Sequence, residues 1–109
     1  TIEQKNEYGK KIGQEIIVQL VSINEVFDKV LAENPNAKIL LKLDCEGEEY
    51  AIFDMLKETT YLNHVAIAII EWHEKGASDI EKVLMHHQFK LRQTHHVTEN
   101  SGMIYAIKN

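Results

Sequence analysis

The sequence predicts an α/β domain in which parallel strands alternate with helices and an antiparallel strand comes last. Short apolar runs rich in β-branched residues alternate along the chain with segments whose apolar residues recur at helical spacing. Each helical segment can carry the chain from one parallel strand to the next through a right-handed crossover. The last two apolar runs are joined by a short polar loop, so these two strands must be antiparallel.

Length and composition fit one folded domain and exclude several functions. The chain has 109 residues, of which 44% are hydrophobic and 27% are charged, a balance typical of globular proteins. Its net charge of −5 argues against nucleic-acid binding, because phosphate contacts need clustered positive charge. The single cysteine excludes a disulfide framework and suits the reducing cytoplasm. No apolar run is long enough to span a membrane, so we expect no membrane partner.

The amino-terminal segment differs from the rest of the chain. Residues 1–14 are polar and show no apolar periodicity, so we expect a poorly ordered arm there. Residues 15–109 carry the alternating pattern of the domain. This region opens with a β-branched run over residues 16–21, which predicts a strand.

A helix is expected to follow this first strand. Ser22 and Glu25 have the spacing of a capping box, in which the serine oxygen accepts a hydrogen bond from the amide three residues later. Apolar residues then recur at helical spacing to about residue 33. Pro35 ends the helix because proline and the residue before it avoid helical geometry.

The centre of the chain predicts two strands around a helix. The mostly apolar run over residues 39–43 is bounded by turn signals and is typical of a strand buried on both faces. Residues 48–57 have a helical pattern. The most apolar run of the chain, residues 65–70, predicts a central strand that ends where Glu71 begins.

The last third of the chain predicts one helix and two strands. Ser78 and Glu81 have the spacing of a second capping box, which would open a helix running to about residue 87. Residues 89–94 and 103–108 then predict the two antiparallel strands.

Charged side chains follow two of the predicted strands. Asp44 and Glu46 come directly after the strand over residues 39–43, and Glu71 and His73 come directly after the central strand. Ligands of open α/β sheets bind outside the carboxyl ends of the parallel strands. If these two strands are neighbours, three carboxylates and an imidazole face one crevice.

Each of these residues also has a simpler explanation. The acidic residues from Glu46 to Glu49 lie at a helix amino terminus, where the helix dipole favours negative charge. Glu71 could be a strand-end residue that backbone amides satisfy. His73 could be an ordinary loop residue. The sequence alone leaves both interpretations open.

The histidines do not form a recognisable metal motif. Four of the six lie in adjacent pairs whose side chains diverge, and the H-E-x-x-H spacing is absent. An oxygen-ligated Mg²⁺ or Ca²⁺ at Asp44, Glu46 and Glu71 stays open, as does a metal-dependent phosphoesterase that uses these carboxylates. The chain also lacks the G-x-G-x-x-G, Walker A and G-x-S-x-G motifs.

Three segments resemble a known family. The run K-L-D-C-E-G-E-E-Y over residues 42–50 resembles the K-I-D-V-E-G-x-E hallmark of FkbM-type methyltransferases. The segment V-S-I-N-E-V-F over residues 21–27 is similar to the strand and S/T-L-D-D-L-L segment that precede the hallmark. The segment I-I-E-W-H over residues 69–73 is similar to the family's I-x-x-E-x-H strand end. The resemblance covers residues 15–108.

The resemblance implies a fold and an activity. FkbM-type enzymes have a three-layer Rossmann-like domain and use S-adenosylmethionine to methylate hydroxyl groups of sugars and other small molecules. By this resemblance Asp44, Glu46, Glu71 and His73 fall on catalytic positions. The resemblance also implies that Asp44 and Cys45 lie beside the cofactor. A divalent metal that acidifies the acceptor hydroxyl is a further possibility.

The resemblance also implies that part of the family's domain is missing from this sequence. The family binds its cofactor chiefly through a glycine-containing loop and an acidic residue in its first half, and neither occurs here. We therefore expect a carboxyl-terminal fragment that is inactive alone and does not bind S-adenosylmethionine. The alternative is a non-catalytic α/β interaction module that forms a homodimer through an exposed sheet edge.

Overall fold

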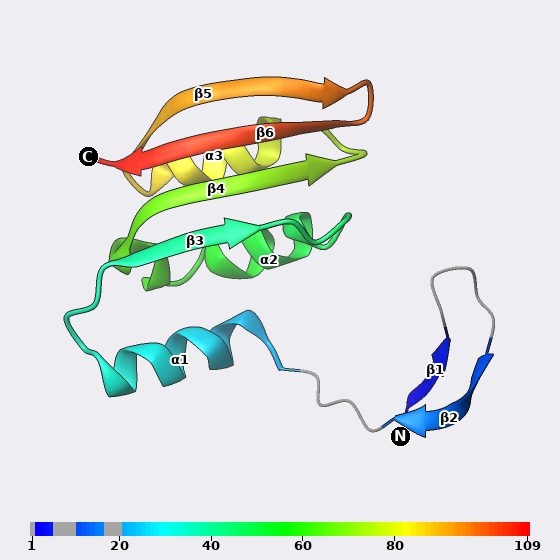
Figure 1. The fold of residues 1–109 in the computed structure, drawn as a ribbon. Helices are drawn as coiled ribbons and strands as arrows, with labels where there is room; N and C mark the ends of the chain where they lie inside the picture. The colour runs from blue at the N-terminus through cyan, green and yellow to red at the C-terminus, as the bar shows by residue number, and fades with distance from the viewer. Residues whose placement is uncertain (1, 6–10, 17–20) are drawn as a thin grey trace.

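The computed structural model describes residues 2–5, 11–16 and 21–109 of the chain. The described part is an α/β fold built around a four-stranded sheet with the order β3-β4-β6-β5 (Figure 1). A separate two-stranded sheet pairs β1 with β2. The elements in chain order are β1 (Ile2–Lys5), β2 (Lys11–Ile16), α1 (Ile23–Glu33), β3 (Ile39–Leu43), α2 (Glu49–Leu56), the short 3₁₀ helix η1 (Tyr61–His64), β4 (Val65–His73), α3 (Ser78–His86), β5 (Phe89–Thr98) and β6 (Ser101–Lys108).

The main sheet is mixed, as the sequence predicts. β3 and β4 are parallel, and the chain crosses between them through α2. β6 lies between β4 and β5 and is antiparallel to both. The prediction that the last two strands pair antiparallel is confirmed. The sheet therefore continues in one direction through β3, β4 and β5, with the last strand inserted in the opposite direction.

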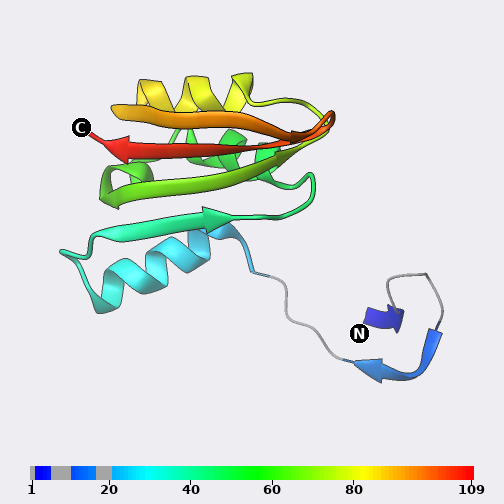
Figure 2. The ribbon, with the colours of Figure 1, turned by 45° about the horizontal axis from the view of Figure 1, so that its top comes forward.

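The helices lie on one face of this sheet (Figure 2), and the residues of the hydrophobic core come from these helices and from the strands. Alternate residues of β4 point into the core, so Ala68, Ile70 and Trp72 are buried. The helices α2 and α3 contribute apolar residues to the same core. The buried apolar residues of these two helices are Phe53, Leu56, Ile80 and Leu84.

The opposite face of the sheet is partly apolar and exposed. Leu40, Ile67 and Ile107 belong to three adjacent strands and are exposed, and cross-strand pairing places them side by side. The expectation that β3 is buried on both faces is wrong, because Leu40 and Lys42 are exposed. An apolar run in the sequence predicts a strand but does not show which faces of that strand other elements cover.

β4 is longer than predicted. The apolar run predicts an end at Ile70, but the strand continues through His73 and stays paired with β6 to Ser101. Glu71 and His73 therefore lie within the strand rather than in the loop after it. They share the face opposite to Ile70 and Trp72, because side chains alternate along a strand.

The two expected capping boxes have different outcomes. The Ser22 hydroxyl accepts a hydrogen bond from the Glu25 amide at 3.2 Å, so the predicted cap of α1 is confirmed. The prediction at Ser78 is wrong, since Ala77 occupies the capping position and no side chain caps α3. Ala77 already has helical backbone angles, which places Ser78 inside the first turn.

The β5–β6 hairpin is also longer than predicted, with a turn at Glu99 and Asn100. A glycine is required within it, because Gly102 lies directly against Trp72. A Cβ at residue 102 would lie 2.6 Å from the Trp72 indole nitrogen and 2.4 Å from the backbone oxygen of His95. This close approach lets the indole pack beneath the hairpin.

The amino-terminal region contains secondary structure that the sequence does not predict. Within the expected arm over residues 1–14, β1 and most of β2 form an antiparallel pair in which Ile2 is opposite Ile16 and Lys5 is opposite Lys11. The expected strand over residues 16–21 lies mostly outside the described residues. In the described part of the chain, no helix is long and apolar enough to cross a membrane.

Candidate functional site

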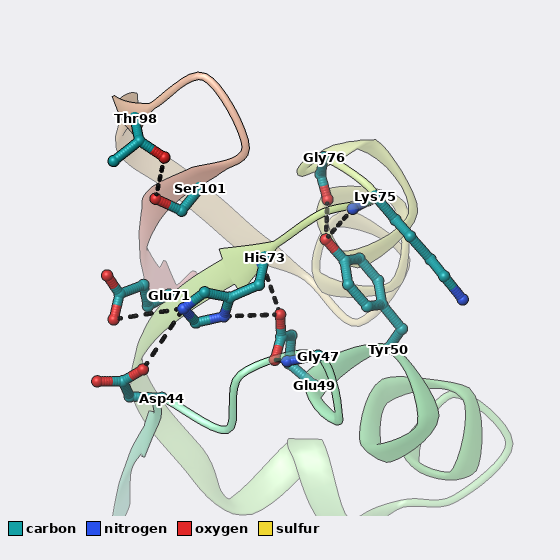
Figure 3. Close-up of polar contacts among 10 residues, drawn as sticks. All are labelled: Asp44, Gly47, Glu49, Tyr50, Glu71, His73, Lys75, Gly76, Thr98 and Ser101. Atoms are coloured by element: carbon teal, nitrogen blue, oxygen red, sulfur yellow. Dashed lines mark hydrogen bonds and ion pairs between the residues drawn. The ribbon is translucent and has the colours of Figure 1, made fainter. Parts of the chain in front are cut away.

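Polar side chains gather where the adjacent parallel strands β3 and β4 approach their carboxyl ends (Figure 3). Leu43 pairs with Ile70, so Asp44 emerges from β3 beside Glu71 of β4. The Nε2 atom of His73 lies 3.7 Å from an oxygen of Asp44 and 3.8 Å from an oxygen of Glu71. Asp44, Glu71 and His73 therefore form one cluster, which we call the strand-end cluster.

A buried carboxylate, that of Glu49, contacts His73 of this cluster. Glu49 begins α2 and is 0% exposed. One of its oxygens accepts a hydrogen bond from the Gly47 amide at 2.8 Å. The other accepts one from the His73 amide at 2.6 Å and lies 3.1 Å from His73 Nδ1. Glu49 thus joins the loop after β3 to the end of β4.

The contact with Glu49 fixes the orientation of the His73 ring. An ionised carboxylate accepts hydrogen bonds only, so a Nδ1 atom that bonds to it carries the proton. In a neutral ring Nε2 then has a free electron pair. The Nε2 atom faces the oxygens of Asp44 and Glu71, as the dashed lines of Figure 3 show.

The backbone between β3 and α2 allows Glu49 to reach this position. Glu46 and Gly47 both have positive φ angles, of 47° and 110°. Glycine adopts such angles without strain, and the turn brings the amide of Gly47 against the carboxylate of Glu49. The loop therefore wraps around the side chain that it binds.

A tyrosine fixes the segment that follows β4. The hydroxyl of Tyr50 donates to the carbonyl of Gly76 at 2.9 Å and accepts from the amide of Lys75 at 3.1 Å. The amide of Glu74 donates to the carbonyl of Asn100 at 2.7 Å. Burial raises the pKa of the Tyr50 hydroxyl, so it stays a neutral donor. These contacts fix the position of residues 74–76, which follow the strand-end cluster in the chain.

The two carboxylates of the cluster affect each other. A hydrogen bond with Asp44 is the main cause that raises the pKa of Glu71, and desolvation and the charges of Asp44 and Glu46 add to it. The charge of His73 acts in the opposite direction. The side chain of Asp44 is 57% exposed, so it is the carboxylate of the cluster that a molecule arriving from solvent meets first.

The structure brings together three of the four catalytic candidates. Glu46 is exposed and, among the contacts of the described residues, makes no hydrogen bond or ion pair with the strand-end cluster. Cys45, the second cofactor candidate beside Asp44, is half-buried, and burial raises the pKa of its thiol.

The resemblance places Glu49 on the acidic hallmark of the family but gives it no specific role. The helix dipole is an alternative explanation of an acidic residue there, and neither explanation predicts that the side chain is buried. A signal was nevertheless present, because Glu49 has helical spacing to the buried residues Phe53 and Leu56.

The cluster also has the composition of a metal site. Asp44, Glu71 and His73 each offer one ligand atom, and these three atoms lie within 4.8 Å of one another. The oxygen-only set of Asp44, Glu46 and Glu71 is not the set that the structure gathers. His73 supplies the third ligand atom of the cluster, and Glu46 is not one of its members.

Comparison with known proteins adds one match. The family model described as the methyltransferase FkbM domain matches residues 2–97. The matched region begins before the 15–108 span of the sequence resemblance and includes β1 and β2. It ends within β5. No curated protein and no solved structure gave a significant match.

Proposed function

This chain belongs to the FkbM methyltransferase domain family, and on that premise we propose that it forms the carboxyl-terminal part of a Rossmann-like methyltransferase domain. The proposed reaction is transfer of a methyl group from S-adenosylmethionine to a hydroxyl group of a sugar or another small molecule. The single free cysteine supports a cytoplasmic location for this activity.

The strand order supports the proposed half-fold. Two parallel strands are followed by an antiparallel hairpin whose last strand inserts beside them. β3 is at the edge of the described sheet, with β4 as its neighbour. We propose that further strands of the complete domain add at this edge, so that the strand-end cluster lies near the middle of a larger sheet.

The convergence of Asp44, Glu71 and His73 over the buried Glu49 is the observation that carries the proposal. A hydroxyl group bound against Asp44 would donate a hydrogen bond to its exposed carboxylate. That carboxylate orients the hydroxyl and accepts its proton during attack on the methyl group. Positioning of this kind supplies much of the rate of a displacement reaction. Glu71 and His73 hold the carboxylate from the strand beside it.

The described residues do not form a complete binding site for the cofactor. The strand-end cluster supplies two carboxylates and an imidazole, which suit a hydroxyl group, and the loop between β3 and α2 has one glycine. We propose that Asp44 and Cys45 border the cofactor and that the rest of its site comes from outside this chain. Calorimetric titration of this chain with S-adenosylmethionine should show no binding, and micromolar affinity would contradict the fragment proposal.

The role of Asp44 can be tested in the complete enzyme that contains this chain. Asp44→Asn should abolish transfer of a labelled methyl group to a panel of sugars and other hydroxyl compounds. Glu48→Gln removes the same charge from an exposed residue of the same loop and should leave transfer unchanged. Near-normal methylation by Asp44→Asn would remove Asp44 from the mechanism.

A second candidate function is supported by the exposed face of the sheet. Among the described residues β3 is an edge strand with an exposed Leu40, and such edges can pair with another chain. A non-catalytic module would use this edge to form a homodimer. Activity of the complete enzyme that depends on Asp44 favours the methyltransferase, because strand pairing does not need that side chain.

A further inference from the structure

We propose that the strand-end cluster binds one divalent transition-metal ion through Asp44, Glu71 and His73. The site has a nitrogen ligand in place of the third carboxylate of an oxygen-only site. Binding of the ion rests on the geometry of the three side chains alone. Its role in activating a hydroxyl group rests on the proposed function.

The first support is the convergence of three electron-pair donors. When Nδ1 of His73 donates to Glu49, Nε2 of the neutral ring can bind a cation. The oxygens of Asp44 and Glu71 lie 3.7 and 3.8 Å from that atom. A cation at the centre of these three ligand atoms would offset the mutual repulsion of the two carboxylates.

The second support is the hydrogen bond on the far side of the imidazole. Histidines that bind metals commonly donate a hydrogen bond from their other ring nitrogen to a carboxylate. This hydrogen bond fixes the ring and makes the metal-binding nitrogen more basic. Glu49 has this position relative to His73, at 3.1 Å from Nδ1. Because Glu49 is fully buried, the imidazole is a rigid ligand.

The distances require only a small movement of the two carboxylates. Metal–nitrogen and metal–oxygen bonds are about 2.0–2.2 Å long, so neighbouring ligand atoms lie roughly 3 Å apart in a filled site. The ligand atoms of the cluster are within 4.8 Å of one another. Asp44 is exposed and Glu71 is partly exposed, so both side chains can rotate toward the nitrogen of His73.

The ligand set indicates which ions would bind. Imidazole suits Fe²⁺ and Zn²⁺ better than Mg²⁺ or Ca²⁺, which prefer oxygen ligands, and the two carboxylates also suit Mn²⁺. Three protein ligands leave open positions on the ion for water or a hydroxyl group. A hydroxyl oxygen bound there would have a lowered pKa, and its proton would pass to the second oxygen of Asp44.

Manganese binding to this chain tests the site directly. The free Mn²⁺ signal in electron paramagnetic resonance should fall during titration as one ion binds per chain. Asp44→Asn and Glu71→Gln should each weaken binding by roughly tenfold or more. Glu48→Gln, which removes an exposed charge of the same loop, should bind like the unchanged chain. Circular dichroism of each variant confirms that it is folded.

The outcomes separate this proposal from the proposed methyl transfer. If the unchanged chain does not bind Mn²⁺ at millimolar concentration, or if both cluster variants bind it equally well, the metal site is refuted. Methyl transfer by the complete enzyme in the presence of a chelator would then show a metal-independent reaction. If Mn²⁺ binds with the expected pattern, it should also broaden the nuclear magnetic resonance signals of the His73 ring.

Discussion

Glu49 is the residue on which the geometry of the site depends. Its carboxylate is fully buried and accepts hydrogen bonds from the amides of Gly47 and His73 while it contacts the imidazole of His73. A buried charge is tolerated only when hydrogen bonds satisfy it, and here they come from two different elements. Glu49 therefore positions His73 without facing the solvent.

Replacement of Glu49 should destabilise the fold. We expect Glu49→Ala to lower the free energy of unfolding by about 3 kcal/mol, because two partly buried amides lose the acceptor that a fully buried carboxylate supplies. Urea unfolding measures this change. Glu48→Ala, at an exposed position one residue earlier, should change stability by less than about 0.5 kcal/mol. Equal effects of the two variants would contradict the structural role of Glu49.

The raised pKa of Glu71 predicts a dependence of stability on pH. The hydrogen bond with Asp44 makes folded Glu71 hold its proton more tightly than the unfolded chain does. Its contribution to stability is therefore complete below its ordinary pKa of 4.5 and is lost as pH rises through the higher folded value.

Urea unfolding at several pH values tests this dependence. The stability of the unchanged chain relative to Glu71→Gln should fall as pH rises above 4.5. In an Asp44→Asn background the trend should weaken, because the carboxylate that causes most of the shift is gone. A difference in stability that stays constant with pH would contradict the shared proton.

At the scale of elements, local sequence patterns predict that a strand or helix exists better than they predict where it begins and ends. The bounds of β3 agree with the sequence because turn residues flank its apolar run. The end of β4 was predicted too early, because Glu71 is charged and follows six apolar residues. The alternation of Ile70 and Trp72 with Glu71 and His73 continues the strand, and pairing with β6 stabilises this extension.

The two serines at helix starts allow a matched test of capping. Ser22→Ala removes the hydrogen bond to the Glu25 amide and should lower stability by about 1 kcal/mol. Ser78→Ala should have an effect below about 0.5 kcal/mol, because Ser78 caps no amide in α3. Thermal unfolding of both variants measures the difference. A larger loss for Ser78→Ala would mean that the sequence pattern was the better guide.

For the whole molecule, the sequence predicts the class of fold and the proximity of Asp44 to Glu71. It does not predict the buried Glu49 that positions His73. The order of apolar runs is sufficient to predict parallel strands with an antiparallel last pair. The adjacency of β3 and β4 then brings Asp44 to Glu71, as the sequence anticipates. The burial of Glu49 and the exposed Leu40 depend on which sheet face the helices cover, and a local pattern does not contain that information.

The exposed sheet face predicts self-association of this chain. Leu40 on β3 is 58% exposed and lies beside Ile67 and Ile107 on the face opposite to the core. Adjacent exposed apolar side chains on a sheet with an open edge favour contact with another copy. Sedimentation velocity at tens of micromolar protein should therefore show dimers or larger species.

Substitutions of two similarly exposed residues locate the contact. Leu40→Lys places a charge at the edge of the sheet and should shift the chain toward monomer. Met85→Lys changes a residue of α3 that is 52% exposed and should leave association unchanged. If the unchanged chain is a monomer, the homodimer is excluded and this apolar face is exposed to solvent in solution. Dissociation by Leu40→Lys alone would identify this face of the sheet as the contact between copies of the chain.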